Sequence, residues 1–162
     1  MKLSQKLIDK INEQINFEQE SAHIYLSMVY EVESRGLAGI GAWLRAQYHE
    51  ELEHAEHMAK YLLRRGVRPA QLPIAGVPNE WGSVLEIFEA AFAHEQEVTK
   101  RIEAIVALAI EEKDYNAEDF YRHFVEEQVE EEENFSGVIE QLKLAGSHGI
   151  LMVDHHMAKR AQ

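Results

Sequence analysis

The sequence predicts an all-α protein: a four-helix bundle with one long crossover connection and a short fifth helix at the C-terminus. Two observations predict this fold class. All three prolines of the 162-residue chain fall between residues 69 and 78, and the glycines gather in a few short stretches, so most of the chain lacks residues that break helices. Four long segments also repeat apolar side chains at the three- and four-residue spacing of a helix with one buried face.

Start and stop signals delimit the first two helices. Ser4 is a suitable N-cap for a helix over residues 4–34, which ends before Gly36. A second helix is expected over residues 40–65, because two arginines occupy its last turn and Gly66 follows in the position where glycine commonly ends a helix. The short connection between the two helices makes them antiparallel neighbours.

Similar signals delimit the second pair of helices. Ser83 and Glu86 have the spacing of a capping box, and they open a helix expected over residues 83–113. After a short turn, a fourth helix is expected over residues 117–145, closing at Gly146. This pair is antiparallel for the same reason as the first.

The connection over residues 66–82 differs from the other two in its length. It can reach roughly 50 Å, whereas the second helix is only about 39 Å long. It can therefore run along the whole bundle and return the third helix parallel to the second. Because Leu72, Ile74 and Val77 make it too apolar for a solvated linker, we expect it to be covered, for example by a second subunit. Residues 1–162 are expected to form a single domain.

A short amphipathic segment over residues 149–160 predicts the fifth helix, whose apolar side could form a packing contact. Its apolar side consists of Ile150, Leu151, Val153 and Met157. Three nearby histidines could line such a contact, bind metal or lie in a solvent-exposed tail: His148, His155 and His156.

The amino-acid composition limits which binding partners and metal ligands the protein can have. Lys and Arg total 16 against 29 Asp and Glu, giving a net charge of −13 at pH 7. This balance disfavours nucleic acid and anionic membranes as partners and favours cations. The absence of cysteine excludes disulfides, iron–sulfur centres and thiol nucleophiles, so any metal must bind carboxylate, imidazole or amide groups. Because residues 1–10 lack a signal-peptide core and no apolar run nears the roughly 18 residues of a membrane helix, we expect a cytoplasmic protein.

Each of the four long helices carries inward-facing polar residues near its midpoint. In a bundle of helices of similar length these residues meet in one layer: Glu18, Glu51, His54, Glu95, Gln128 and Glu131. Burying several unpaired carboxylates together costs several kcal/mol each, and a bound pair of cations removes that cost. Carboxylate and imidazole ligands without thiolate suit iron or manganese, and four carboxylates with one imidazole are typical of di-iron bundles.

Two other interpretations of the polar layer remain open at this point. The polar layer could be a hydrogen-bonded network without metal, or the site of a di-iron oxygenase. The oxygenase needs a substrate cavity, but the core positions that flank the layer carry side chains that fill such a space: Ile15, Ala22, Leu44, Ala55, Ala91, Val98 and Phe124.

The segments 12–18, 50–54, 94–95 and 127–132 resemble the ferroxidase motifs of prokaryotic non-haem ferritins in the ferritin-like superfamily. The resemblance covers essentially the whole chain, including the crossover and the fifth helix. It implies that Glu18, Glu51 and His54 hold one iron. It also implies that Glu51, Glu95 and Glu131 hold a second, with Gln128 beside it and Tyr25 next to the site. Glu50, Glu127 and Glu130 match a third, looser iron site.

The resemblance implies a function as well as a fold. It implies an iron-storage protein that oxidises Fe(II) with dioxygen or hydrogen peroxide. It further implies that ferric oxyhydroxide is deposited inside a shell of 24 subunits, in which the fifth helix could pack at a fourfold axis. The absence of cysteine excludes the rubrerythrins, and the mini-ferritins lack this four-helix ligand set.

Three positions depart from related patterns. Leu52 stands where bacterioferritins have a haem-binding Met, and Gln128 and Glu131 replace their Glu-x-x-His motif, so we predict no haem. Met58 is assigned to core packing. His123 stands where relatives often carry Trp, so an electron-transfer role of that Trp does not transfer to this chain.

Overall fold

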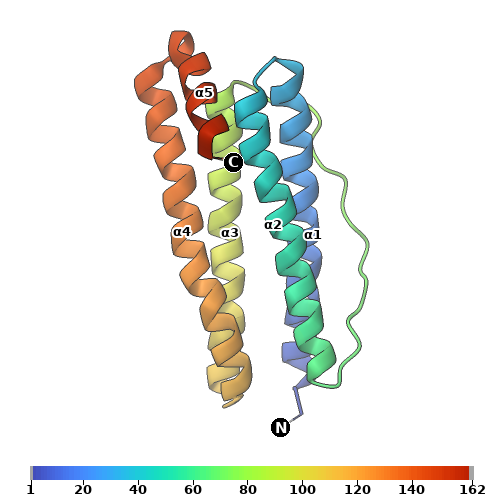
Figure 1. The fold of residues 1–162 in the computed structure, drawn as a ribbon. Helices are drawn as coiled ribbons and strands as arrows, with labels where there is room; N and C mark the ends of the chain where they lie inside the picture. Colours follow the sequence, from blue (N-terminus) through green and yellow to red (C-terminus); the bar gives the residue numbers. More distant parts are fainter. Residues whose placement is uncertain (1, 161–162) are drawn as a thin grey trace.

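The computed structural model describes residues 2–160, and within this range the chain is helical with no β-strand. The all-α fold class predicted from the sequence is confirmed (Figure 1). The helices are α1 (Gln5–Ser34), α2 (Ala38–Arg64), α3 (Val84–Glu111), α4 (Tyr115–Ala145) and α5 (Ile150–Arg160), with a 3₁₀ turn at Ser147–Gly149. None of these helices combines the length and hydrophobicity needed to cross a membrane.

Capping residues explain where several helices begin and end. Ser4 accepts a hydrogen bond from the backbone of the first turn of α1, and Ser83 forms the capping box of α3. The start of α4 was predicted at residue 117, but Asp114 caps it and brings the first residue forward to Tyr115. Conversely, α3 ends at Glu111 and not at residue 113, since Lys113 has a left-handed φ of 56°.

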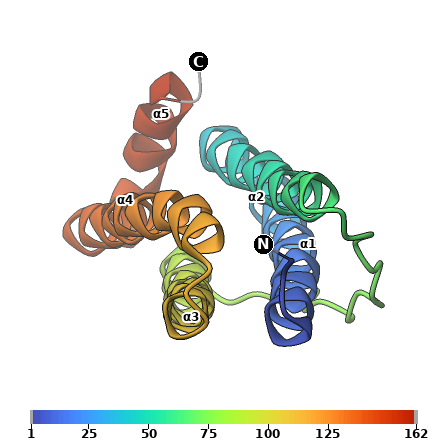
Figure 2. The same ribbon diagram turned by 90° about the horizontal axis from the view of Figure 1, so that it is seen from below.

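Two antiparallel helix pairs make up the bundle. α1 packs against α2 and α3 packs against α4, while α1 also contacts α3 across the two pairs. The crossover leaves the lower end of α2 and returns to the upper end of the bundle, so α3 runs parallel to α2 (Figures 1 and 2). This register places the midpoints of the four long helices at one level.

The crossover follows the flank of α1. Near its start, the backbone N–H of Ala70 donates to Asn12 Oδ1 at 2.8 Å, and near its end the indole N–H of Trp81 donates to Ser27 Oγ at 3.0 Å. Of the three apolar residues expected to be covered, Leu72 and Val77 are half-buried and Ile74 is 40% exposed. Cover by a second subunit stays a prediction, since the structure contains one chain.

The apolar core divides into two clusters, one on each side of the polar layer. The upper cluster includes Val29, Phe88 and Phe135, and the lower one includes Ile11 and Met58, which packs there as predicted. The layer is therefore sealed along the bundle axis by close-packed hydrocarbon.

α5 packs against α2 and α4 at the upper end of the bundle (Figure 2). Val153 and Met157 are buried there, whereas Leu151, predicted on the same apolar side, is 71% exposed because it faces away from α2 and α4. The Asp154 carboxylate accepts a hydrogen bond of 2.8 Å from the N–H of Ile40, in the first turn of α2. The three histidines of this region are exposed: His148, His155 and His156.

Gly39 is required for this docking, because a Cβ atom there would lie 2.0 Å from the carbonyl oxygen of Asp154. We expect Gly39→Ala to displace α5, to lower the free energy of unfolding by roughly 2 kcal/mol and to expose the C-terminal segment to proteases. The control is Gly137→Ala, since no atom lies within 4 Å of the added methyl and alanine favours the helix by about 1 kcal/mol. Guanidinium unfolding and limited proteolysis measure both variants. Wild-type behaviour of Gly39→Ala would show that the contact does not matter.

Candidate metal centre

The polar layer brings together the side chains that the sequence predicted for it. Each of the four long helices contributes at least one of them: Glu18 from α1, Glu51 and His54 from α2, Glu95 from α3, and Gln128 and Glu131 from α4. The four carboxyl groups and the amide are all buried, and the His54 side chain is only 12% exposed. Four carboxyl groups therefore share one water-poor volume at the middle of the bundle.

The most compact part of the layer joins α1 to α2. Glu18, Glu51 and His54 each place one ligand atom within 4.8 Å of the others, and this is the one such set of three among residues 2–160. His54 Nδ1 lies 3.4 Å from Glu51 Oε2. Carboxylate and imidazole are ligands that divalent transition metals accept, so these three side chains could hold one cation.

Glu95 occupies the other half of the layer, between two hydrogen-bond donors. The Tyr25 hydroxyl donates to Glu95 Oε1, and Gln128 Nε2 donates to Glu95 Oε2 at 3.1 Å. Both donors were placed next to the site by resemblance, and the structure brings both into direct contact with Glu95. Their hydrogen bonds fix the plane of this carboxyl group.

Several carboxylate oxygens in the layer have no donor to satisfy them. Glu18 Oε2, Glu51 Oε2 and Glu131 Oε2 are buried and accept no hydrogen bond from an N–H or hydroxyl group, although a proton held on Glu18 can join it to Glu51. A buried acceptor without a partner costs about 1–3 kcal/mol, and more when it is charged. Three such oxygens in one layer fit a site for cations, which can supply the missing partners.

Burial also changes the protonation of the layer. Burial first, and then the charges of neighbouring carboxylates, raise the pKa of Glu18 and Glu51 well above the ordinary value and that of Glu131 to about 8. Burial raises the pKa of Glu95, and the hydrogen bond from Tyr25 lowers it part of the way back. Without a cation the layer therefore holds protons at neutral pH, and a cation must displace them to bind.

The three residues that match the third, looser iron site are Glu50, Glu127 and Glu130, and they are called the outer site below. They lie beside the polar layer on the α2 and α4 side. Glu50 is half-buried, and its pKa is raised by burial and by the charges of Glu127 and Glu130. Glu127 Oε2 lies 3.7 Å from His54 Nε2, whereas Glu130 is exposed. These carboxylates influence one another, but they do not form a compact set of three ligands.

Two neighbours of the layer were missed by the sequence analysis. Gln14 is buried and donates from Nε2 to Glu18 Oε1 at 2.7 Å, which fixes that carboxyl group. Its position four residues before Glu18, on the same helix face, was the signal that could have revealed it. His94 lies next to Glu95, where it stacks on Phe17 and contacts Ser21 Oγ at 2.6 Å. Burial lowers the pKa of His94 to about 4, so this imidazole is neutral.

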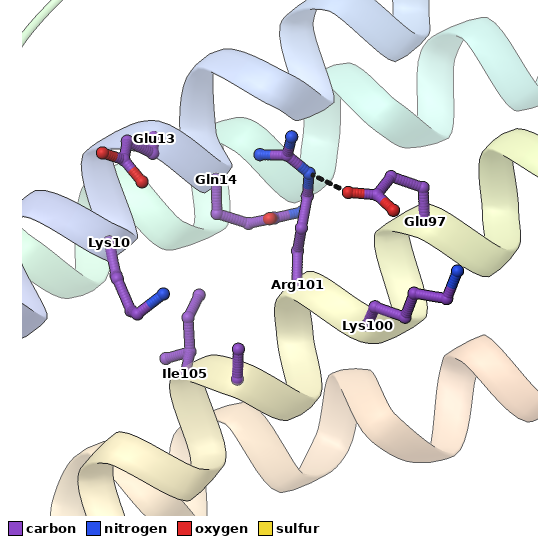
Figure 3. A pocket seen from close by; sticks show the side chains of 8 residues that line it. Lys10, Glu13, Gln14, Glu97, Lys100, Arg101 and Ile105 are labelled. Atoms are coloured by element: carbon purple, nitrogen blue, oxygen red, sulfur yellow. Dashed lines mark hydrogen bonds and ion pairs between the residues drawn. The ribbon is translucent and has the colours of Figure 1, made fainter.

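Gln14 also forms part of the wall of a pocket of about 240 Å³ between α1 and α3 (Figure 3). The rest of the lining is mainly charged: Lys10, Glu13, Glu97, Lys100 and Arg101, with Ala104 and Ile105. Arg101 is fixed by an ion pair with Glu97 at 3.0 Å and lies over the Phe17 ring at 3.9 Å. One amide side chain therefore separates this pocket from a carboxylate of the layer.

The seven core residues that flank the layer are all buried, as their types predicted: Ile15, Ala22, Leu44, Ala55, Ala91, Val98 and Phe124. The space that an oxygenase substrate would need beside the layer is taken by these side chains.

Comparison with known proteins identifies the family. A family model described as the ferritin-like domain matches residues 8–145, which include every residue of the polar layer. The chain belongs to the ferritin family.

Individual ferritins match over nearly the full chain. The bacterial non-heme ferritin of Bacteroides fragilis (strain 638R) is 42% identical over 158 residues, covering 98% of this chain and 99% of the relative. That of Campylobacter jejuni subsp. jejuni is 36% identical and covers 91% of this chain and 88% of the relative. The solved structure of an open pore ferritin from Archaeoglobus fulgidus is 39% identical, with a TM-score of 0.94 and 96% of each chain covered. The resemblance to prokaryotic non-haem ferritins is thereby confirmed.

The raised pKa values make the stability of this metal-free ferritin depend on pH. A carboxyl group with a higher pKa in the folded state stabilises the fold below its unfolded pKa, and this stability is lost as pH rises through the folded pKa. For Glu131 that window runs from 4.5 to about 8. We expect EDTA-treated protein to lose free energy of unfolding between pH 5 and pH 8, and Glu131→Gln to lose about 3 kcal/mol less.

Guanidinium unfolding at both pH values measures this difference. Glu126→Gln is the control, because Glu126 lies on the same helix but is exposed. If Glu131→Gln and Glu126→Gln lost the same free energy of unfolding between pH 5 and pH 8, the raised pKa of Glu131 would be contradicted.

Proposed function

We propose that the chain is an iron-storage ferritin that oxidises Fe(II) to Fe(III) at the polar layer and deposits ferric oxyhydroxide inside an oligomeric shell. The observation that supports this most directly is the set of unpartnered buried oxygens on Glu18, Glu51 and Glu131. In a metal-free layer a shared proton can join Glu18 to Glu51, but Glu131 Oε2 still has no partner, whereas bound cations can satisfy all three oxygens. Family membership supports iron as that cation.

In this proposal two Fe(II) ions are substrates that bind side by side. Glu18 and His54 hold the first, Glu95 and Glu131 hold the second, and Glu51 contacts both. Hard carboxylate oxygens favour Fe(III) over Fe(II), so this ligand set promotes the loss of one electron from each ion. The two electrons pass to dioxygen or hydrogen peroxide.

The remaining residues keep these ligands in place and manage their protons. Gln14 fixes Glu18, while Tyr25 and Gln128 fix Glu95, so the carboxylates need little rearrangement when the cations bind. The protons held at the raised pKa values leave as Fe(II) binds. Glu50, Glu127 and Glu130 are proposed as a third, looser iron site beside the first two.

Storage requires a closed assembly, which one chain cannot form. We propose a shell of 24 subunits without haem, in agreement with the non-heme ferritins among the relatives. The partly exposed apolar side chains of the crossover and the exposed Leu151 and Leu144 are suited to contacts between subunits.

Removal of Glu51 tests the oxidation step, since this carboxylate contacts both proposed iron positions. We expect Glu51→Ala to lower the initial rate of aerobic Fe(II) oxidation at least about 100-fold. Stopped-flow absorbance of Fe(III) measures the rate. Glu53→Ala is the control, because Glu53 is exposed on the same helix two residues away. Wild-type rates in Glu51→Ala would exclude the layer as the site of oxidation.

The storage step is tested separately by adding a few hundred Fe(II) per presumed shell in air. We expect iron to elute from a size-exclusion column together with a protein particle of several hundred kilodaltons. Iron that precipitates while the protein elutes as a small oligomer would contradict storage.

A further inference from the structure

The two sides of the polar layer present opposite charges to an approaching cation. On the α1 and α3 side, the pocket beside Gln14 is lined by Lys10, Lys100 and Arg101, and one of its two carboxylates is neutralised by Arg101 (Figure 3). On the α2 and α4 side, the neighbours are the carboxylates of the outer site. A divalent cation is therefore attracted more strongly to the second side than to the first.

On this second side, imidazoles and carboxylates alternate from the surface to the layer. His123 Nε2 lies 3.0 Å from Glu127 Oε1, and Glu127 Oε2 lies 3.7 Å from His54 Nε2. His54 Nδ1 in turn lies 3.4 Å from Glu51 Oε2. The exposed fraction of the side chains falls along this line from 60% at His123 through 31% and 12% to 3% at Glu51.

The pair of His123 and Glu127 differs from an ordinary ion pair on a helix surface. Glu127 Oε2 is buried, forms no hydrogen bond and faces His54 rather than solvent. Its distance of 3.7 Å from His54 Nε2 is too long for a hydrogen bond. Two ligands at about 2.1 Å from one metal ion lie roughly 3.0 Å apart at a right angle and roughly 3.6 Å apart at 120°. The 3.7 Å between Glu127 Oε2 and His54 Nε2 matches the wider separation, whereas the 3.0 Å between His123 Nε2 and Glu127 Oε1 is also an ordinary hydrogen-bond length.

We propose that His123 and Glu127 form a binding site for a divalent transition-metal cation, from which the cation passes by way of His54 to the buried layer. An imidazole with a carboxylate selects such ions over Mg²⁺ and Ca²⁺, which prefer oxygen ligands alone. His123 thus distinguishes this site from the three carboxylates of the outer site. The transfer step, but not the binding, rests on the proposed function.

The two ring nitrogens of His54 account for the proposed transfer of the cation from Glu127 to the buried layer. Its ring turns Nε2 toward Glu127 and Nδ1 toward Glu51, so it faces both locations. A neutral imidazole has one nitrogen lone pair and can bind a cation on one side at a time. The ring therefore releases the outer position when it binds in the layer.

Binding is tested with Co²⁺, which stays divalent in air and reports its ligands by visible absorption. We expect His123→Ala to bind one Co²⁺ per chain roughly tenfold or more weakly than wild type, with a change in the absorption of that step. The matched control is His23→Ala, because His23 is also exposed on a helix but lies on α1. Identical Co²⁺ titrations of His123→Ala and His23→Ala would overturn the proposed site.

Transfer is tested with Fe(II) at less than one equivalent per chain. We expect His123→Ala to slow the initial oxidation severalfold relative to His23→Ala, while the amount finally oxidised stays the same. Normal rates together with weakened Co²⁺ binding would overturn the transfer step. If the wild type itself does not oxidise iron, the proposed function fails, and the Co²⁺ titrations still decide whether the site exists.

Discussion

Four buried carboxyl groups in one layer are the constraint on which the rest of this structure depends. Glu18, Glu51, Glu95 and Glu131 can meet only if the midpoints of four helices lie at the same level. Short turns secure this within each antiparallel pair, but α2 and α3 run parallel. The long crossover is thus a consequence of the layer, because only a connection spanning the whole bundle returns α3 in the required register.

The same burial sets the chemistry of the layer. Apolar clusters above and below exclude water, which raises the carboxyl pKa values and makes proton and metal cation competitors for the same oxygens. The hydrogen bonds are distributed accordingly. Gln14 uses one oxygen of Glu18 and leaves the other free, so the carboxyl group is oriented without being satisfied. A layer with every oxygen paired would be more stable without metal and would bind it less well.

What the sequence could predict follows from the range of the interactions involved. Local patterns were sufficient for features that depend on a few neighbouring residues. Capping signals placed Ser4 and Ser83, and helical periodicity placed the midpoint carboxylates. The anchoring of α5 could not be found in this way, because Asp154 meets the first turn of α2 more than 100 residues earlier in the chain. The exposure of Leu151 has the same origin, since only the docking angle of α5 decides which apolar residues face α2.

The site shows a similar division. Periodicity identified the inward-facing polar residues, but it could not show that, among residues 2–160, Glu18, Glu51 and His54 alone form a compact set, since that depends on rotamers. It also assigned His123 no contact, and the structure places this residue against Glu127.

The distribution of charge, more than the total charge, makes the two sides of the polar layer different for a cation. A net charge of −13 attracts cations to every face, yet the pocket between α1 and α3 gathers lysine and arginine beside Gln14. If attraction of cations were the only requirement, acidic residues would serve equally well on both sides of the layer. Instead, three cationic side chains accompany Glu13 and Glu97 on the α1 and α3 side, and in the proposed route a cation reaches the layer from the α2 and α4 side, past Glu127 and His54. The α1 and α3 side remains suited to groups that fix ligands, such as Gln14, because no cation competes for them there.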